Sequence, residues 1–166
     1  MRRLLVGFAG ALFTTTLSAA EFGPEVDRAI NTCLDAARKQ HVGQPTGWDL
    51  QWGPGGLAFL VELVAQDNRV YQMRCEAGNI VKEERKAGLK QYEMVSTRHR
   101  VEEPEARQTA AAEYNGGELT HMEYDLNWRG NPYYIYKFNL PDGRIATVSV
   151  NAVTGKIDRS NSDRKK

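Results

Sequence analysis

The sequence predicts an α+β protein of two tandem modules, each made of one helix packed on a three-stranded antiparallel sheet. In each half, apolar residues first recur at helical spacing and then alternate with polar ones, as strands require. The same order of elements also occurs twice along the chain, with the same turn chemistry before the last strand of each half. A repeated helix-then-strands order favours two small modules over one larger domain.

The first module begins with a helix over residues 25–40, and its apolar positions form one stripe. That stripe consists of Val26, Ile30, Cys33, Leu34 and Ala37. A first strand is predicted from the alternation of Trp48, Leu50 and Trp52, followed by a Gly-Pro-Gly-Gly turn at residues 53–56. Residues 57–65 and 69–76 are the second and third strands, joined by an Asp-Asn turn at residues 67–68.

The second module repeats this order. Pro104 stands in the first turn of an Ala-rich helix over residues 105–114, which Asn-Gly-Gly at 115–117 ends. A first strand is predicted from the alternation of Tyr124, Leu126 and Trp128. Residues 133–140 and 144–150 are the next two strands, and the Asp-Gly pair between them is typical of a hairpin.

The two modules can be aligned through their last turns. Asp67-Asn68-Arg69 corresponds to Asp142-Gly143-Arg144. The alignment places Cys75 at the position of Val150, which is an inward, core position of the third strand. Most strand aromatics are interpreted as core residues, because they follow the alternation.

The chain has two cysteines, Cys33 and Cys75, both in the first module. Since Cys33 lies on the helix stripe and Cys75 at an inward strand position, a disulfide between them would fasten the helix to the sheet. Two buried free thiols are the alternative. A cysteine nucleophile is the least favoured interpretation, because no His is close to either residue in the sequence.

Residues 1–20 have the three parts of a cleavable secretory signal. Arg2 and Arg3 give a positive start, residues 4–13 form a short apolar run, and Ser-Ala-Ala at 18–20 supplies the small residues of a cleavage site. An uncleaved N-terminal anchor is the alternative, but the run is shorter than the roughly 20 residues that span a bilayer. No later segment is long and apolar enough to cross a membrane. We therefore expect a periplasmic or secreted protein without stable membrane insertion after cleavage.

The charge balance argues against two classes of partner. The chain has 22 basic and 21 acidic residues, and removal of residues 1–20 leaves 20 against 21, a net charge of −1 with His neutral. Nucleic-acid binders and polybasic membrane binders normally concentrate basic residues on one surface. We expect no nucleic-acid partner.

The predicted modules span residues 21–82 and 103–160. Residues 83–102 are charged with scattered apolar positions, and they form either a partly packed linker or a strand extension. Residues 161–166 are polar and charged, which predicts a disordered tail.

The second module resembles the PepSY domain family. The resemblance rests on the Ala-rich helix from Glu105, the aromatic strand at 134–138, the Asp-Gly turn at 142–143, and the segment from Val148 to the Thr-Gly pair at 154–155. It covers residues 103–160, and the first module resembles the family more loosely. The family implies a helix on a small antiparallel sheet. Its members include propeptides of secreted metallopeptidases, with a proposed inhibitory or chaperone role, stand-alone exported proteins, and domains beside membrane-bound sensors or reductases.

No catalytic or cofactor motif stands out. His41, His99 and His121 have no metal-ligand spacing, and although His121 and Glu123 share a strand face, a zinc site needs three or four ligands. Patterns typical of serine hydrolases, zinc peptidases and phosphate-binding loops are absent. We predict a protein that is not an enzyme and that uses no metal and no cofactor.

One face of each sheet is predicted to need a cover. Residues 57–65 are apolar on both faces, whereas one helix covers a single face. Leu60, Val64 and Ile135 should point away from the helices and are the candidate interface residues. The other module, a second copy or a target protein could cover them, and module against module is favoured. Open strand edges could also take an extended partner segment.

These observations favour a non-enzymatic exported protein that binds and inhibits or regulates an exported or membrane-anchored protein, for example a peptidase. The alternative is a periplasmic ligand- or metal-sensing domain that serves a membrane sensor or reductase. A homodimer is compatible with both hypotheses. An enzyme of unfamiliar type is the least favoured class, because no set of residues meets the usual geometric roles.

Overall fold

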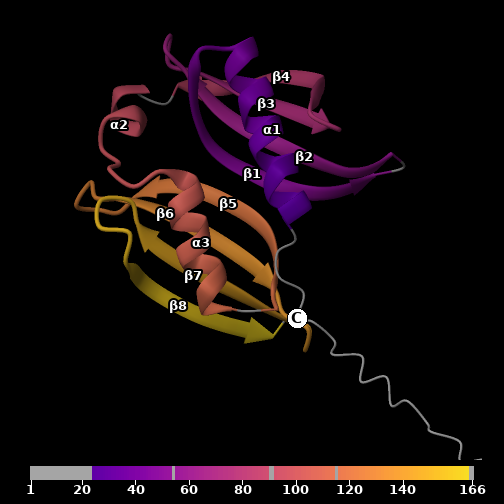
Figure 1. Cartoon of the computed structure of the whole chain (residues 1–166). Coiled ribbons are helices and arrows are strands. Elements are labelled where there is room, and N and C mark those ends of the chain that lie inside the picture. The colour runs from indigo at the N-terminus through magenta and orange to yellow at the C-terminus, as the bar shows by residue number, and fades with distance from the viewer. Residues whose placement is uncertain (1–23, 54, 90–91, 115, 165–166) are drawn as a thin grey trace, which may run out of the picture.

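The computed structural model describes residues 24–53, 55–89, 92–114 and 116–164. In these residues, eight strands form one antiparallel sheet with the order β4-β3-β2-β1-β5-β6-β7-β8 (Figure 1). The α+β class is confirmed, but the prediction of two separate three-stranded sheets is wrong. Each half contributes four strands, and the halves join edge to edge through their first strands. The predicted signal peptide lies outside the described residues.

The first half supplies one long helix and four strands that follow one another in the sheet. These are α1 (Pro24–Gln40), β1 (Gly43–Gly53), β2 (Gly56–Ala65), β3 (Arg69–Glu76) and β4 (Asn79–Leu89). The predicted stripe of α1 faces the sheet, and Ile30, Cys33 and Ala37 are at most 1% exposed. Burial of this stripe, rather than intrinsic propensity alone, holds the helix in place.

A short helix, α2 (Tyr92–Ser96), connects to the second half. That half repeats the arrangement with α3 (Glu103–Glu113), β5 (Glu118–Leu126), β6 (Pro132–Asn139), β7 (Arg144–Asn151) and β8 (Ile157–Arg164). Both long helices lie on the same face of the sheet (Figure 1). None of the described helices is long and apolar enough to cross a membrane.

The core fills the layer between the helices and the sheet. Trp48 packs edge-on against Phe59, with ring centroids 6.2 Å apart. The Tyr134 and Tyr136 hydroxyls donate to the backbone carbonyls of Val101 and Glu103 at 3.0 and 3.2 Å, which meets the hydrogen-bonding need of buried tyrosines. Two strand aromatics depart from the core interpretation, since Trp52 is 73% and Trp128 85% exposed.

The two edge strands carry little of the apolar alternation that marks strands in the sequence. Residues 83–89 of the predicted linker belong to β4, and residues 161–164 of the predicted disordered tail belong to β8, where Arg164 pairs with Arg144. An edge strand has one backbone neighbour and little apolar cover, so its sequence carries charges instead of alternating apolar residues. Residues 82–85, Lys-Glu-Glu-Arg, are all exposed.

Phe59 and Tyr134, which the sequence alignment of the two halves matched, hold similar places in the strand pairing. Phe59 of β2 pairs with Cys75 of β3, and Tyr134 of β6 pairs with Val150 of β7. Cys75 and Val150 therefore hold equivalent positions. Cys75 forms a disulfide with Cys33, with a Cα–Cα distance of 5.8 Å, which joins β3 to α1 as predicted.

Candidate functional site

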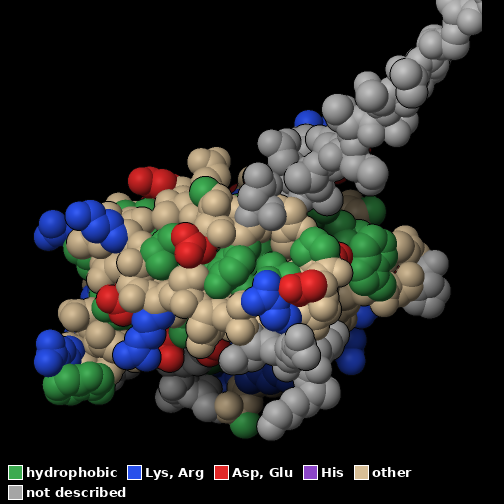
Figure 2. Space-filling view, turned by 90° about the horizontal axis from the view of Figure 1, so that it is seen from below, with side chains coloured by type: hydrophobic (Ala, Val, Ile, Leu, Met, Phe, Trp, Pro, Cys, Tyr) green, Lys and Arg blue, Asp and Glu red, His purple; other side chains and the backbone are tan. Residues whose placement is uncertain are grey.

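The face of the sheet opposite α1 and α3 is called the open face here. Strand alternation places half-buried and exposed side chains of mixed character on it. They include Asp49, Leu60, Glu62, Arg74, His121, Glu123, Tyr133, Ile135 and Lys137. Seen from below, the surface of the molecule shows hydrophobic side chains in separate patches among acidic and basic ones (Figure 2).

The three predicted interface residues have different surroundings. Val64 is completely buried at the end of the sheet where α2 contacts β1 and β2, so it does not contribute to an accessible surface. Leu60 and Ile135 are half-buried on the open face, at equivalent positions of β2 and β6. In the described residues the favoured cover, module against module, is wrong, because the modules join edge to edge in one sheet.

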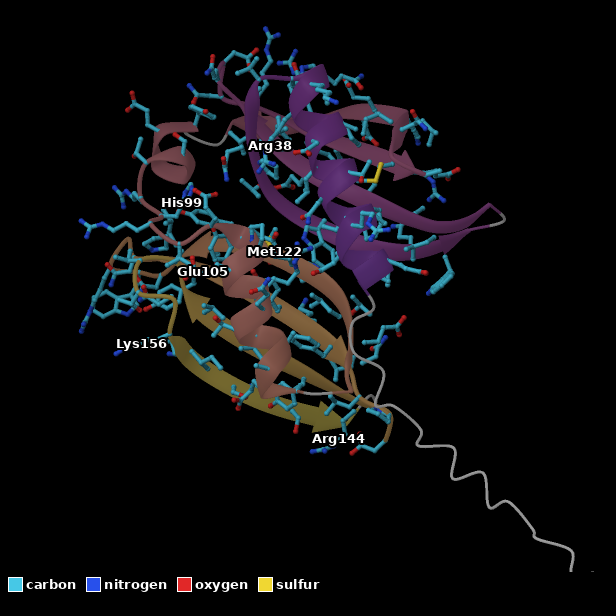
Figure 3. The ribbon with its side chains drawn as sticks, in the orientation of Figure 1. Arg38, His99, Glu105, Met122, Arg144 and Lys156 are labelled. Atoms are coloured by element: carbon cyan, nitrogen blue, oxygen red, sulfur yellow. A yellow bond between two sulfur atoms is a disulfide. The ribbon has the colours of Figure 1, made fainter. Side chains whose placement is uncertain are left out.

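The two halves meet along a short seam between β1 and β5. Its three residue pairs are Gly47 with Glu123, Trp48 with Met122, and Asp49 with His121. Met122 lies at the junction of the halves, beneath the helix layer (Figure 3). A Cβ on Gly47 would lie 3.1 Å from the Met122 carbonyl oxygen, so the close approach of the two strands favours glycine there.

On the open face, the seam carries a small polar cluster. The Nδ1 atom of His121 lies 2.5 Å from an Asp49 carboxylate oxygen, and its Nε2 atom lies 3.8 Å from Glu123. Sequence reasoning noticed His121 and Glu123 but missed Asp49, which is 72 positions away. Among the described residues no group of three or more His, Cys, Asp or Glu side chains could hold a metal ion. The Asp49–His121 pair is a polar contact between β1 of the first half and β5 of the second.

We expect Asp49→Asn to lower the free energy of unfolding by less than about 1 kcal/mol, because a partly exposed ion pair contributes little. The Asp49 and His121 side chains are 49% and 21% exposed. Urea denaturation at low and high salt measures the effect, with Asp35→Asn on the outside of α1 as the comparison. A loss above about 2 kcal/mol would show that the pair is essential to the seam.

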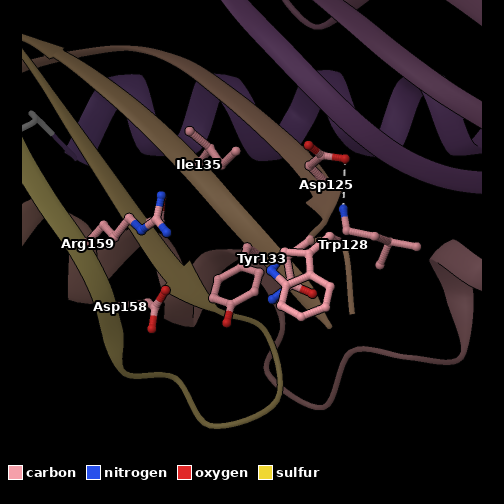
Figure 4. Close-up of a pocket in the computed structure, with 9 residues that line it drawn as sticks. Asp125, Trp128, Tyr133, Ile135, Asp158 and Arg159 are labelled. Atoms are coloured by element: carbon pink, nitrogen blue, oxygen red, sulfur yellow. Dashed lines mark hydrogen bonds between the residues drawn. The ribbon is translucent and has the colours of Figure 1, made fainter. Parts of the chain in front are cut away.

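A hollow of about 310 Å³ lies on the open face of the second half, beside the β5–β6 turn (Figure 4). We call it the Trp128 hollow. Its apolar surface comes from Leu126, Trp128, Tyr133 and Ile135, and its polar rim includes Asp125, Asp158 and Arg159. Strands β5, β6, β7 and β8 all contribute to it, so the site forms only when the sheet is assembled.

The β5–β6 turn holds Trp128 outward. The Asn127 side-chain oxygen accepts hydrogen bonds from the backbone N–H groups of Arg129 and Asn131 at 3.0 and 2.9 Å. Gly130 adopts the left-handed conformation with φ 75°. Its carbonyl accepts a hydrogen bond from the Arg98 guanidinium at 2.9 Å, which ties the turn to the segment before α3. Trp128 is thus presented by an ordered turn although it is mostly exposed.

A second polar cluster lies between the two long helices, with Arg107 and Glu103 buried at its centre. Arg107 of α3 is 2% exposed and donates to the Asn31 side-chain oxygen of α1 at 2.9 Å. Its Nε atom lies 3.4 Å from Asp27 and 3.6 Å from Glu103. Burial raises the pKa of the Glu103 carboxyl above its ordinary value, and the neighbouring Arg107 charge opposes that rise. Arg107 thus links α3 to Asp27 and Asn31 of α1, which joins the helices of the two halves.

Residues 101–157 match the family model described as peptidase propeptide and YPEB domain, PepSY. Over these residues the second half of the chain is similar to a PepSY domain. The matched PepSY residues take in α3, β5, β6 and β7, together with the walls of the Trp128 hollow from β5 and β6. The match does not include the first half, so its membership in the PepSY family stays a prediction.

Two solved structures are similar to this chain. A candidate lipoprotein from Clostridium difficile 630 has 15% sequence identity and a TM-score of 0.50, covering 82% of this chain and 91% of its own. The Bacillus megaterium YpeB C-terminal domain has 9% identity and a TM-score of 0.32, covering 84% of this chain and 65% of its own. The first shares the overall fold. No curated protein sequence matches the chain.

Proposed function

We propose that this chain is an exported, non-catalytic PepSY protein that binds and regulates another protein through the open face of its sheet. The observation that carries the proposal is the one-sided cover of the sheet. Both long helices lie on one face, and the other face keeps half-buried Leu60 and Ile135 and the Trp128 hollow. An apolar area with a polar rim is the usual anatomy of a protein interface.

Two further observations support the class of partner. The disulfide between Cys33 and Cys75 is typical of proteins that work in an oxidising compartment, which supports export. The family description names peptidase propeptides, so an exported or membrane-anchored peptidase is the first partner to test. In this proposal, the PepSY protein acts on a separate polypeptide and controls its activity by binding.

Site-specific photocrosslinking tests the proposal. A benzoylphenylalanine at Lys137, exposed on the open face, is expected to capture a partner in the native envelope or secreted fraction. The same group at Gln108, exposed on α3 on the helix side, is the matched control. Mass spectrometry identifies the captured protein, and its activity is then measured with and without the purified chain. Equal capture from both positions, or none from Lys137, would contradict binding through the open face.

A further inference from the structure

We propose that the Trp128 hollow receives a lysine or arginine side chain from an extended segment of the partner protein. The inference rests on the proposed function and states the chemistry of the contact. It follows from the aromatic rings of the hollow, from the carboxylates beside them, and from the apolar surface beneath.

The aromatic rings of the hollow favour a cation. The Trp128 and Tyr133 rings lie next to each other at its mouth (Figure 4). Tryptophan is the best aromatic partner for an ammonium or guanidinium group. The Arg129 guanidinium already lies 4.4 Å from the centroid of the Trp128 ring, which shows that the ring accepts a cation in this turn. The ring surface that lines the hollow is open to a second, incoming group.

Two carboxylates lie on either side of this aromatic pair. Asp125 is the cross-strand neighbour of Tyr133, and Asp158 comes from β8 (Figure 4). One Asp125 oxygen accepts the Leu126 backbone N–H at 2.7 Å, which leaves the other oxygen for a ligand. Within the part of the chain that the structure describes, the Asp158 side chain has no hydrogen-bond or ion-pair partner. This end of the hollow is therefore complementary to a positive charge.

The remaining surface fits the rest of a basic side chain and its backbone. Ile135 offers apolar contact for the methylene stem of lysine or arginine, which packs on such surfaces while its charged head stays polar. Arg159 lies further along, in the row of Ile135 and Ser149, where it can donate to carbonyl oxygens of the partner's main chain. A purely apolar occupant would instead desolvate the rim carboxylates without pairing them.

Binding of small probes tests the hollow itself. N-acetyl-lysine methylamide and N-acetyl-arginine methylamide are titrated into the ¹⁵N-labelled full chain without its signal. N-acetyl-glutamine methylamide serves as the neutral comparison. The basic probes are expected to shift the Trp128 indole N–H, with affinity at least about fivefold above that of the neutral probe. Equal binding of the neutral probe would overturn the proposal.

Variants of exposed residues extend this test without risk to folding. Trp128→Ala and Asp158→Asn are each expected to weaken binding of the basic probes about fivefold. Trp52→Ala is the matched control, because Trp52 is a similarly exposed tryptophan at the end of β1 in the other half. Loss of binding in Trp128→Ala and Asp158→Asn, with binding retained in Trp52→Ala, supports the proposal. Unchanged binding in Trp128→Ala, or the same loss in Trp52→Ala, would overturn it.

Photocrosslinking from Lys137 separates this inference from the proposed function. Loss of partner capture in Trp128→Ala and Asp158→Asn, with capture retained in Trp52→Ala, supports the hollow as the contact. Undiminished capture in the first two variants overturns the hollow but leaves the proposed function standing. If the chain with the crosslinker at position 137 and no other change captures no partner, the proposed function is overturned. The probe titration then tests the hollow independently.

Discussion

Replacing Cys33 by Ala together with Cys75 by Val is expected to lower the free energy of unfolding by about 4 kcal/mol. The disulfide joins residues 42 positions apart, and closing a loop of that length restricts the unfolded chain strongly. Valine at position 75 copies the equivalent Val150 of the second half, so the packing change is small. Urea denaturation with a linear extrapolation measures the loss.

Reduction of the unmodified protein provides the control for this prediction. A thiol reductant should bring its urea midpoint down to that of the double variant, and the variant itself should not respond. A loss below about 1 kcal/mol would contradict the prediction. It would mean that apolar packing against the sheet is enough to hold α1 in place.

The second large effect is expected from Arg107→Met, which should lower the free energy of unfolding by about 3–5 kcal/mol at neutral pH. Methionine replaces most of the side-chain volume but removes the charge that faces Glu103, and both side chains are less than one-tenth exposed. The variant leaves a buried carboxylate without its cation and breaks the hydrogen bond to Asn31 of α1. Chemical denaturation measures the loss.

The Arg107→Met effect should depend on pH, because burial raises the folded-state pKa of Glu103 above its ordinary value of 4.5. Folded Glu103 therefore holds its proton more tightly than unfolded Glu103. Its contribution to stability is greatest at low pH and is lost as pH rises through the raised pKa. Removing Arg107 takes away the charge that lowers this pKa, so the stability difference from the unmodified protein should be larger near pH 8 than near pH 5.

A double variant, Glu103→Gln with Arg107→Met, is the control for the charge argument. It should recover part of the stability lost in Arg107→Met and should show a weaker pH dependence, since no buried carboxylate remains at position 103. If the double variant is as unstable as Arg107→Met and equally dependent on pH, then the loss arises from packing and not from the unpaired Glu103 charge.

The candidate site illustrates what sequence patterns miss. The alternation of Trp128 with Tyr124 suggested a core position, but β5 ends at Leu126 and the following turn points Trp128 outward. Asp49 and His121 come from different halves and meet only because β1 and β5 pair. Asp158 lies in the polar edge strand β8, whose sequence carries no strand alternation. Each of these residues acquires its surroundings from the assembled sheet.

By itself, the sequence determined the α+β class, the apolar stripe of α1 and the Cys33–Cys75 disulfide. These features follow from local periodicity, because residues close together in the sequence show which positions point inward. Only the tertiary structure decided that two sets of four strands share one sheet and that one face of it stays open. Strand edges pair through backbone groups that every residue carries, so the side chains do not specify which edges meet.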